Sequence, residues 1–183
     1  MKNRALLIRA DGSQQIGTGH VMRCAALAQT WRVRTGGPIV FALATDVPAL
    51  EARLHAEGAQ IVHLSARPGS VEDAKQTIAL AHRCHASWIV VDGYHFGAEY
   101  QRILKDADLH LLAIDDYGHA EQYYADVILN QNLHAHESLY ANRQPYTRLL
   151  LGGRYMLLRR EFVQHDTRLP TIPAVARRVL VTL

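Results

Sequence analysis

Residues 5–34, ALLIRADGSQQIGTGHVMRCAALAQTWRVR, contain an apolar run, a loop with two glycines and an amphipathic stretch in direct succession. The run at 5–9 is typical of a buried strand, and the apolar side chains of 20–34 recur at helical spacing. This order predicts the first strand, connection and helix of an α/β layer structure.

The same alternation continues along the chain. Six further apolar runs, flanked by Gly, Pro or Asp, lie at 38–44, 60–64, 88–92, 109–115, 126–130 and 148–152. Such nearly continuous apolar strands are typical of a parallel sheet that is covered on both faces. Helical spacing of apolar residues predicts helices at 20–34, 47–57, 71–85 and 98–106. We therefore predict right-handed βαβ units in a Rossmann-like α/β sandwich.

The length of 183 residues fits one such domain better than two. We assign residues 1–164, which end in a helical stretch at 157–164, to an N-terminal Rossmann-like domain. Residues 165–178 are polar and contain proline, and the apolar run 178–183 follows them. We expect residues 165–183 to be an interdomain linker and the first strand of a truncated C-terminal nucleotide-binding domain.

Composition narrows the range of partners. The net charge is +3, and the basic residues form no long run, so we predict no nucleic-acid partner. The N-terminus turns polar too early for a signal peptide, and no apolar run reaches the roughly 20 residues of a membrane span. We expect a cytoplasmic protein without a membrane partner. Cys24 and Cys84 lie in helical patterns, where a cysteine usually behaves as a small apolar residue.

Polar residues follow four of the predicted strands, at the edge where open α/β sheets bind ligands. Any one of them alone could be a turn or cap residue. Because they share an edge, we expect one crevice that gathers Asp11, Asp92, Gly93, Tyr94, His95, Asp115, Asp116, Asn130, Gln131 and Asn132.

His20 begins the first predicted helix, directly after the loop with Gly17 and Gly19. These glycines would let the loop approach a ligand closely, and the positive end of the helix dipole favours a neutral imidazole. A neutral imidazole can take a proton from water. Asp11, if close, would orient the ring or partly reverse the preference for the neutral form. The alternative is a packed or cap-like histidine. The loop lacks G-x-G-x-x-G, which argues against a Rossmann dehydrogenase.

Two other histidine pairs raise the question of a metal. His82 and His85 are three residues apart on a helix, and His134 and His136 are close together. Neither pair has the additional Cys, Glu or His that a metal site needs nearby. We predict no metal and no cofactor.

Several motifs together resemble a known family. They are IRADGSQQIGTGHVMRCAALA (8–28), VVDGYHF (90–96), AIDDYG (113–118), DVILNQN (126–132) and LGGRYMLLRREF (151–162). In order and spacing they are similar to the UDP-sugar hydrolases of pseudaminic acid biosynthesis, which act on UDP-2,4-diacetamido-2,4,6-trideoxy-β-L-altropyranose. The resemblance implies the N-terminal half of a glycosyltransferase-B (GT-B) fold.

The resemblance also implies a reaction. His20, the histidine of the G-x-G-H motif, would be the general base that activates water for inverting cleavage of the anomeric C–O bond. The expected substrate-binding residues are Asp11, Gly17, Gly19, Arg23, Asp92, Tyr94, His95, Asp115, Asp116 and Asn130. We expect the chain by itself to be nearly inactive, because the half that binds the diphosphate would be missing. The alternatives are a GT-B glycosyltransferase with a UDP-sugar donor and a non-catalytic domain that binds sugar nucleotides.

Overall fold

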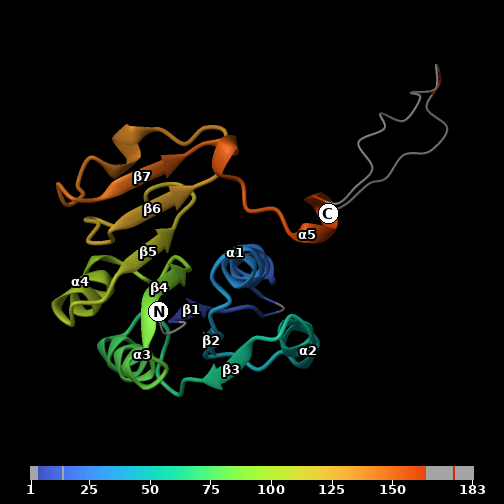
Figure 1. Ribbon diagram of the computed structural model, residues 1–183. Helices are drawn as coiled ribbons and strands as arrows, with labels where there is room; N and C mark the ends of the chain where they lie inside the picture. Colours follow the sequence, from blue (N-terminus) through green and yellow to red (C-terminus); the bar gives the residue numbers. More distant parts are fainter. Residues whose placement is uncertain (1–3, 14, 164–174, 176–183) are drawn as a thin grey trace.

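The computed structural model describes residues 4–13, 15–163 and 175. Its centre is one seven-stranded sheet in the order β3-β2-β1-β4-β5-β6-β7 (Figure 1). The strands are β1 (Ala5–Ala10), β2 (Ile39–Leu43), β3 (Gln60–His63), β4 (Ala86–Asp92), β5 (Leu111–Ile114), β6 (Val127–Asn130) and β7 (Arg148–Leu151). All neighbouring pairs are parallel. The predicted strands and their parallel arrangement are confirmed.

Helices cover both faces of the sheet. The helices α1 (Gly19–Thr35) and α2 (Pro48–Ala56) lie on one side, and α3 (Val71–Arg83) and α4 (Ala98–Asp106) lie on the other (Figure 1). The four predicted helices are confirmed, with ends that differ by at most two residues. Two apolar cores result, one between the sheet and each helical layer.

The central strand β1 supplies side chains to both cores. Leu6 and Ile8 pack toward α1 and α2, and Leu7 between them packs toward α3 and α4. Burial of each of these side chains contributes roughly 1.5–3 kcal/mol. Arg9 is also fully buried, because it forms ion pairs with Asp11 and Asp73 at 2.7 and 2.9 Å.

The α/β alternation stops after α4. The connections from β5 to β6 and from β6 to β7 contain no α-helix; the second contains the short 3₁₀ helix η1 (Glu137–Tyr140). Buried aromatic side chains fill this region instead, since Tyr123 and Tyr140 are at most 1% exposed. The sequence predicts no α-helix in these two connections, and the structure agrees.

The segment after β7 also differs from the prediction. It contains a short 3₁₀ helix, η2 (Gly153–Tyr155), and a single helical turn, α5 (Arg160–Val163), instead of a helix over 157–164. The Leu157 N–H donates to the side-chain oxygen of Gln131 at 2.9 Å, and Leu157 packs on the core beside α1. These contacts hold residue 157 outside a helix. Apart from Val175, the predicted linker and strand at 165–183 lie outside the described residues.

Within the described part of the chain, no helix is both long and apolar enough to cross a membrane.

Candidate functional site

His20 lies in the first turn of α1 and is held by a buried carboxylate. Its Nδ1 is 2.6 Å from Oδ1 of Asp92, the last residue of β4. Because an ionised carboxylate can only accept, Nδ1 must donate, which leaves Nε2 as an acceptor in the neutral ring. The His20 side chain is 15% exposed and that of Asp92 is 0% exposed. The carboxylate that contacts His20 is thus Asp92, whereas Asp11, considered for this place on the condition that it lay close, pairs with Arg9.

Arg23, one helical turn after His20, joins two strand ends. Its Nε and Nη2 donate to Asp92 at 2.6 and 2.7 Å, and its Nη1 donates to Asp116 at 2.7 Å. The hydroxyl of Tyr94 donates to Asp116 at 3.0 Å, and the Tyr94 ring lies edge-on to His20 with centroids 5.1 Å apart. Five of the predicted residues therefore form one connected cluster, which we call the His20 cluster: His20, Arg23, Asp92, Tyr94 and Asp116.

The cluster has defined charges at neutral pH. Burial lowers the pKa of Arg23, but hydrogen bonds to Asp92 and Asp116 outweigh it and raise the pKa overall. Burial raises the pKa of Asp116, but Arg23 outweighs it and leaves the pKa below its ordinary value. Burial and the bond to Asp116 raise the pKa of Tyr94 to about 12. The arginine and the carboxylate are charged, and the phenol keeps its proton.

Asp11 and His95 belong to a second group around Arg9. Asp11 is 2% exposed and accepts hydrogen bonds from Arg9 and from the Ala44 N–H at 2.7 and 2.6 Å. His95 Nε2 lies 3.8 Å from Asp11 Oδ2. Burial, together with the Arg9 charge, lowers the pKa of His95. Asp11 thus has its oxygens engaged within the protein, and its contact with a substrate stays a prediction.

Asp115 and Asn130 are likewise buried and act as internal supports. Asp115 accepts from the hydroxyls of Tyr123 and Tyr140 at 2.6 and 3.2 Å. Asn130 donates to the Tyr140 hydroxyl at 2.8 Å and to the backbone oxygen of Asp116 at 2.9 Å. These bonds fix the loop after β5 against the end of β6. Their predicted role in substrate binding is untested.

Gly17 lies two residues before α1, and Gly19 is the first residue of that helix. Gly17 has a φ of +74°, in the left-handed region that favours glycine. A Cβ at either glycine would meet no atom within 4 Å among the described residues. Among the described residues there is thus room for a ligand beside both glycines, and their predicted contact with a substrate stays a prediction.

Asn132, which the sequence also places at this edge, donates to Asp116 at 2.9 Å. Other neighbours of the cluster were not predicted as site residues: the Cys24 thiol lies 3.4 Å from Asp92. His119 Nδ1 forms a hydrogen bond of 2.6 Å with Asp115 Oδ2. The ring centroids of Tyr117 and Tyr94 are 5.1 Å apart. The loop after β5 has no sequence periodicity, so only the four-residue spacing of Asp115 and His119 hinted at their contact.

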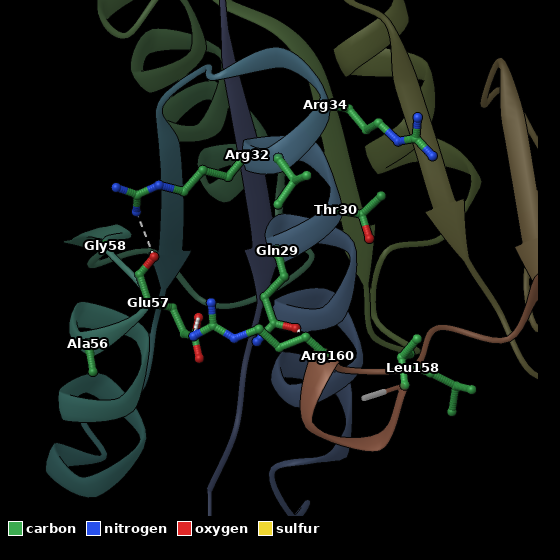
Figure 2. Close-up of a pocket in the computed structure, with 11 residues that line it drawn as sticks. Gln29, Thr30, Arg32, Arg34, Ala56, Glu57, Gly58, Leu158 and Arg160 are labelled. Atoms are coloured by element: carbon green, nitrogen blue, oxygen red, sulfur yellow. Dashed lines mark hydrogen bonds and ion pairs between the residues drawn. The ribbon is translucent and has the colours of Figure 1, made fainter. Parts of the chain in front are cut away.

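A separate groove of about 510 Å³ contains none of the predicted site residues. It lies between the later part of α1, the end of α2 and the C-terminal turn α5 (Figure 2). There the Arg160 N–H donates to Gln29 and the Arg160 guanidinium pairs with Glu57. These contacts attach α5 to the outside of the domain. No group of three or more potential metal-binding side chains gathers in the part of the chain that the structure describes.

Comparison with known proteins supports the resemblance seen in the sequence. No protein-family model matches the chain. The chain is 25% identical over 163 residues to the UDP-2,4-diacetamido-2,4,6-trideoxy-β-L-altropyranose hydrolase of Campylobacter jejuni, covering 87% of this chain and 53% of that protein. It is 21% identical to an uncharacterized protein of Methanocaldococcus jannaschii, with 86% and 31% covered. The chain thus spans about half the length of the first of these relatives and less of the second.

Solved structures show the same fold. HepE of Anabaena, in a complex with UDP-glucose, superposes with a TM-score of 0.53 and 14% identity over 79% of this chain and 43% of that one. MurG of Acinetobacter baumannii gives a TM-score of 0.50 and 11% identity over 73% and 42%. The chain therefore has the fold of the N-terminal half of a GT-B protein, and its sequence resembles the UDP-diacetamido-trideoxy-altropyranose hydrolases.

Proposed function

We propose that this chain is the sugar-binding half of a UDP-sugar hydrolase, in which His20 is the general base. The observation that carries the proposal is the pairing of His20 Nδ1 with the buried Asp92, which leaves Nε2 as the proton acceptor. The similarity to the Campylobacter jejuni hydrolase supports a UDP-linked diacetamido-trideoxy sugar as the substrate.

The reaction needs one proton transfer and one displacement. Nε2 of His20 takes a proton from water while the water oxygen bonds to the anomeric carbon, on the face opposite UDP. The bond between that carbon and the phosphate oxygen breaks, UDP leaves with the electron pair, and the configuration at the anomeric carbon inverts. The Asp92 carboxylate then stabilises the imidazolium that has formed, because it already accepts from Nδ1. UDP is a good leaving group, so this route needs no strong general acid.

The charges of the cluster indicate where leaving-group stabilisation must come from. Arg23 is the cation of the cluster and is engaged by both Asp92 and Asp116. Its charge is therefore compensated within the protein and is not available to a diphosphate. Since the chain covers 53% of the related hydrolase, we expect the diphosphate contacts to come from the other half of the active protein.

The test uses the complete gene product that contains this chain. It is incubated in ¹⁸O-labelled water with the UDP-diacetamido-trideoxy sugar and no acceptor, and the products are followed by mass spectrometry. Hydrolysis predicts UDP and free sugar, with the label on the anomeric oxygen of the sugar and none in UDP. Turnover that requires an added acceptor would instead support a glycosyltransferase. Binding without turnover would support a non-catalytic domain.

A variant of the base tests its role. His20→Ala is expected to lower kcat by roughly 10²- to 10⁴-fold, the usual contribution of a general base. The matched control is His82→Ala, which removes an exposed imidazole near the end of α3. The proposal fails if both variants turn over at the rate of the parent protein.

A further inference from the structure

We propose that His119 is a second ligand-binding imidazole of this site, whose Nε2 accepts a hydrogen bond from the amide N–H of an acetamido group on the sugar. The inference rests on the proposed function, because it places the same sugar over the same edge of the sheet.

His119 is held in the same way as His20. Its Nδ1 lies 2.6 Å from Oδ2 of Asp115, and the side chains of His119 and Asp115 are 10% and 0% exposed. Asp115 also accepts from the backbone N–H groups of Tyr117 and Gly118 at 2.7 and 2.6 Å. An ionised carboxylate has no hydrogen to give, so His119 Nδ1 donates and Nε2 of the neutral ring keeps its lone pair.

Among the residues that the structure describes, Nε2 of His119 has no hydrogen-bond partner. It is one of two buried side-chain nitrogen or oxygen atoms without a hydrogen bond in the described ranges; the other is Nε1 of Trp31. Folded proteins leave few buried polar atoms unpaired, and such an atom beside a candidate site calls for a partner from outside. A bound ligand would supply that partner.

The rings around Nε2 show how a ligand could reach it. Tyr94 and Tyr117 lie 5.9 and 6.2 Å from the His119 ring between centroids, and they are 49% and 52% exposed. Tyr123 also contacts His119 but is 1% exposed. Of the three rings beside His119, Tyr94 and Tyr117 are therefore the exposed ones. Because Asp116 holds the Tyr94 hydroxyl, rotation of the Tyr117 side chain is the route that we propose for a ligand to reach Nε2.

The Tyr94 ring lies close to both imidazoles. Tyr94 lies 5.1 Å from His20 as well as 5.9 Å from His119, measured between ring centroids. A sugar that packs on Tyr94 can therefore present its anomeric carbon to His20 and a substituent to His119.

The chemistry around Nε2 selects the substituent. A neutral Nε2 accepts a hydrogen bond, so the ligand must donate one. The exposed Tyr94 and Tyr117 rings, 5.1 Å apart, offer apolar faces beside it. An acetamido group meets both requirements, because its N–H can donate to Nε2 and its methyl group can pack on the aromatic rings. A hydroxyl group can donate the hydrogen bond but has no apolar part to pack on the rings.

The experiment compares two nucleotides that differ at a single substituent. UDP-N-acetylglucosamine and UDP-glucose are titrated into the complete gene product by calorimetry, for the parent protein and for His119→Asn. The asparagine amide can still donate to Asp115 in place of Nδ1, but it lacks any group at the position of Nε2. The control is Tyr140→Phe, which removes a hydroxyl that donates to Asp115 at 3.2 Å and leaves His119 intact.

The parent protein is expected to bind UDP-N-acetylglucosamine about tenfold more tightly than UDP-glucose, the equivalent of one good hydrogen bond. His119→Asn should abolish this preference and leave the affinity for UDP-glucose unchanged. Tyr140→Phe should keep the preference. Equal affinities in the parent protein, or a loss in His119→Asn that is the same for both nucleotides, would overturn the proposal.

These outcomes are separable from the proposed hydrolysis. His20→Ala is expected to lose turnover and to keep the preference for the acetamido nucleotide. If the parent protein prefers the acetamido nucleotide but does not hydrolyse the UDP-sugar, the proposed function fails while the role of His119 stands. If the protein hydrolyses the UDP-sugar but shows no preference between the two nucleotides, the role of His119 fails while the proposed function stands.

Discussion

Asp92 links His20 to Arg23, since it accepts a hydrogen bond from His20 Nδ1 and two from Arg23, with both oxygens engaged. Replacement by asparagine puts a donor where an acceptor is needed, which opposes the proposed orientation and tautomer of His20. We predict that Asp92→Asn lowers kcat at least about 100-fold. In a His20→Ala background the same change should have little further effect, because the two residues act as a unit.

Steady-state kinetics of the two single variants and the double variant test this prediction. Thermal unfolding must accompany them, because removing one partner from a buried ion pair costs about 3–5 kcal/mol. Folded Asp92→Asn protein with parental kcat would show that Asp92 only supports the fold.

Gly19 allows a test of ligand approach that is separate from stability. A Cβ there meets nothing within 4 Å, so Gly19→Ala should fold normally and gain up to about 1 kcal/mol from the lower chain entropy of alanine. If the sugar nucleotide passes close to this backbone, the methyl will raise KM about tenfold, the equivalent of about 1.4 kcal/mol. Kinetics and denaturant unfolding measure the two effects. Unchanged KM in a stable variant would place the ligand elsewhere.

At the scale of elements, the loop before α3 is locked against the loop after β4. Gly69 has a φ of +78°, and a Cβ there would lie 2.2 Å from the backbone oxygen of His95. We predict that Gly69→Ala destabilises the protein by at least about 1–3 kcal/mol, the usual cost of such backbone strain.

Gly97, in the same loop region, is the matched control for Gly69. Its φ is −73°, and a Cβ there meets nothing within 4 Å. Gly97→Ala is expected to change stability by no more than about 0.5 kcal/mol, since it lacks both strain and clash. Urea unfolding measures the free energy of unfolding of both variants. Equal decreases in the two variants would contradict the predicted effect of the contact between the two loops.

The strands and helices were predictable because their signals are local. Continuous apolar runs identify buried parallel strands, and Ala98–Asp106 shows helical spacing along its whole length. The region after Asp106 was harder, since Tyr123 and Tyr140 come from loops without periodicity and are buried by contacts with distant residues. Only tertiary packing determines their positions.

The candidate site was likewise predictable only in part. Polar residues after strands β1, β4 and β5 indicated the correct edge of the sheet. Which carboxylate reaches His20 was not predictable, because Asp11 and Asp92 both end neighbouring strands and the backbone register alone does not choose between them. The structure resolves the choice through Arg9, which binds Asp11 and also pairs with Asp73 of α3, on the face of the sheet opposite α1.

On the scale of the whole molecule, the His20 cluster lies where the strand order reverses. From β1 the chain builds outward through β2 to β3, then crosses to β4 on the other side of β1 and continues to β7. At such a switch point the loops after the two central strands diverge and leave a crevice, which is where open α/β sheets bind ligands. His20 follows β1 and Asp92 ends β4, so the topology of the sheet itself brings the proposed base to its carboxylate.

The stability of the protein depends on pH through Asp115, which lies at the same edge of the sheet. Asp115 follows β5 and accepts hydrogen bonds from the hydroxyls of Tyr123 and Tyr140. Burial raises the pKa of Asp115, but hydrogen bonds from His119, Tyr123 and the Gly118 N–H outweigh it and leave the pKa below its ordinary value. The unfolded chain therefore binds a proton at higher pH than the folded protein does. The resulting stabilisation is complete above the unfolded value of about 3.9 and is lost as pH falls below it.

Asp115→Asn removes this titration and several of the hydrogen bonds. We predict a free energy of unfolding about 1–3 kcal/mol lower at pH 7 and a shallower decline between about pH 4 and pH 2 than in the parent protein. Asp106→Asn, at an exposed carboxylate paired with Arg102 on α4, should leave the curve within about 0.5 kcal/mol of the parent. Urea titrations at several pH values provide the curves. Because the hydrogen-bond loss acts at every pH and the titration acts only in acid, a parallel downward shift of the Asp115→Asn curve would mean that Asp115 supports the loop without its charge.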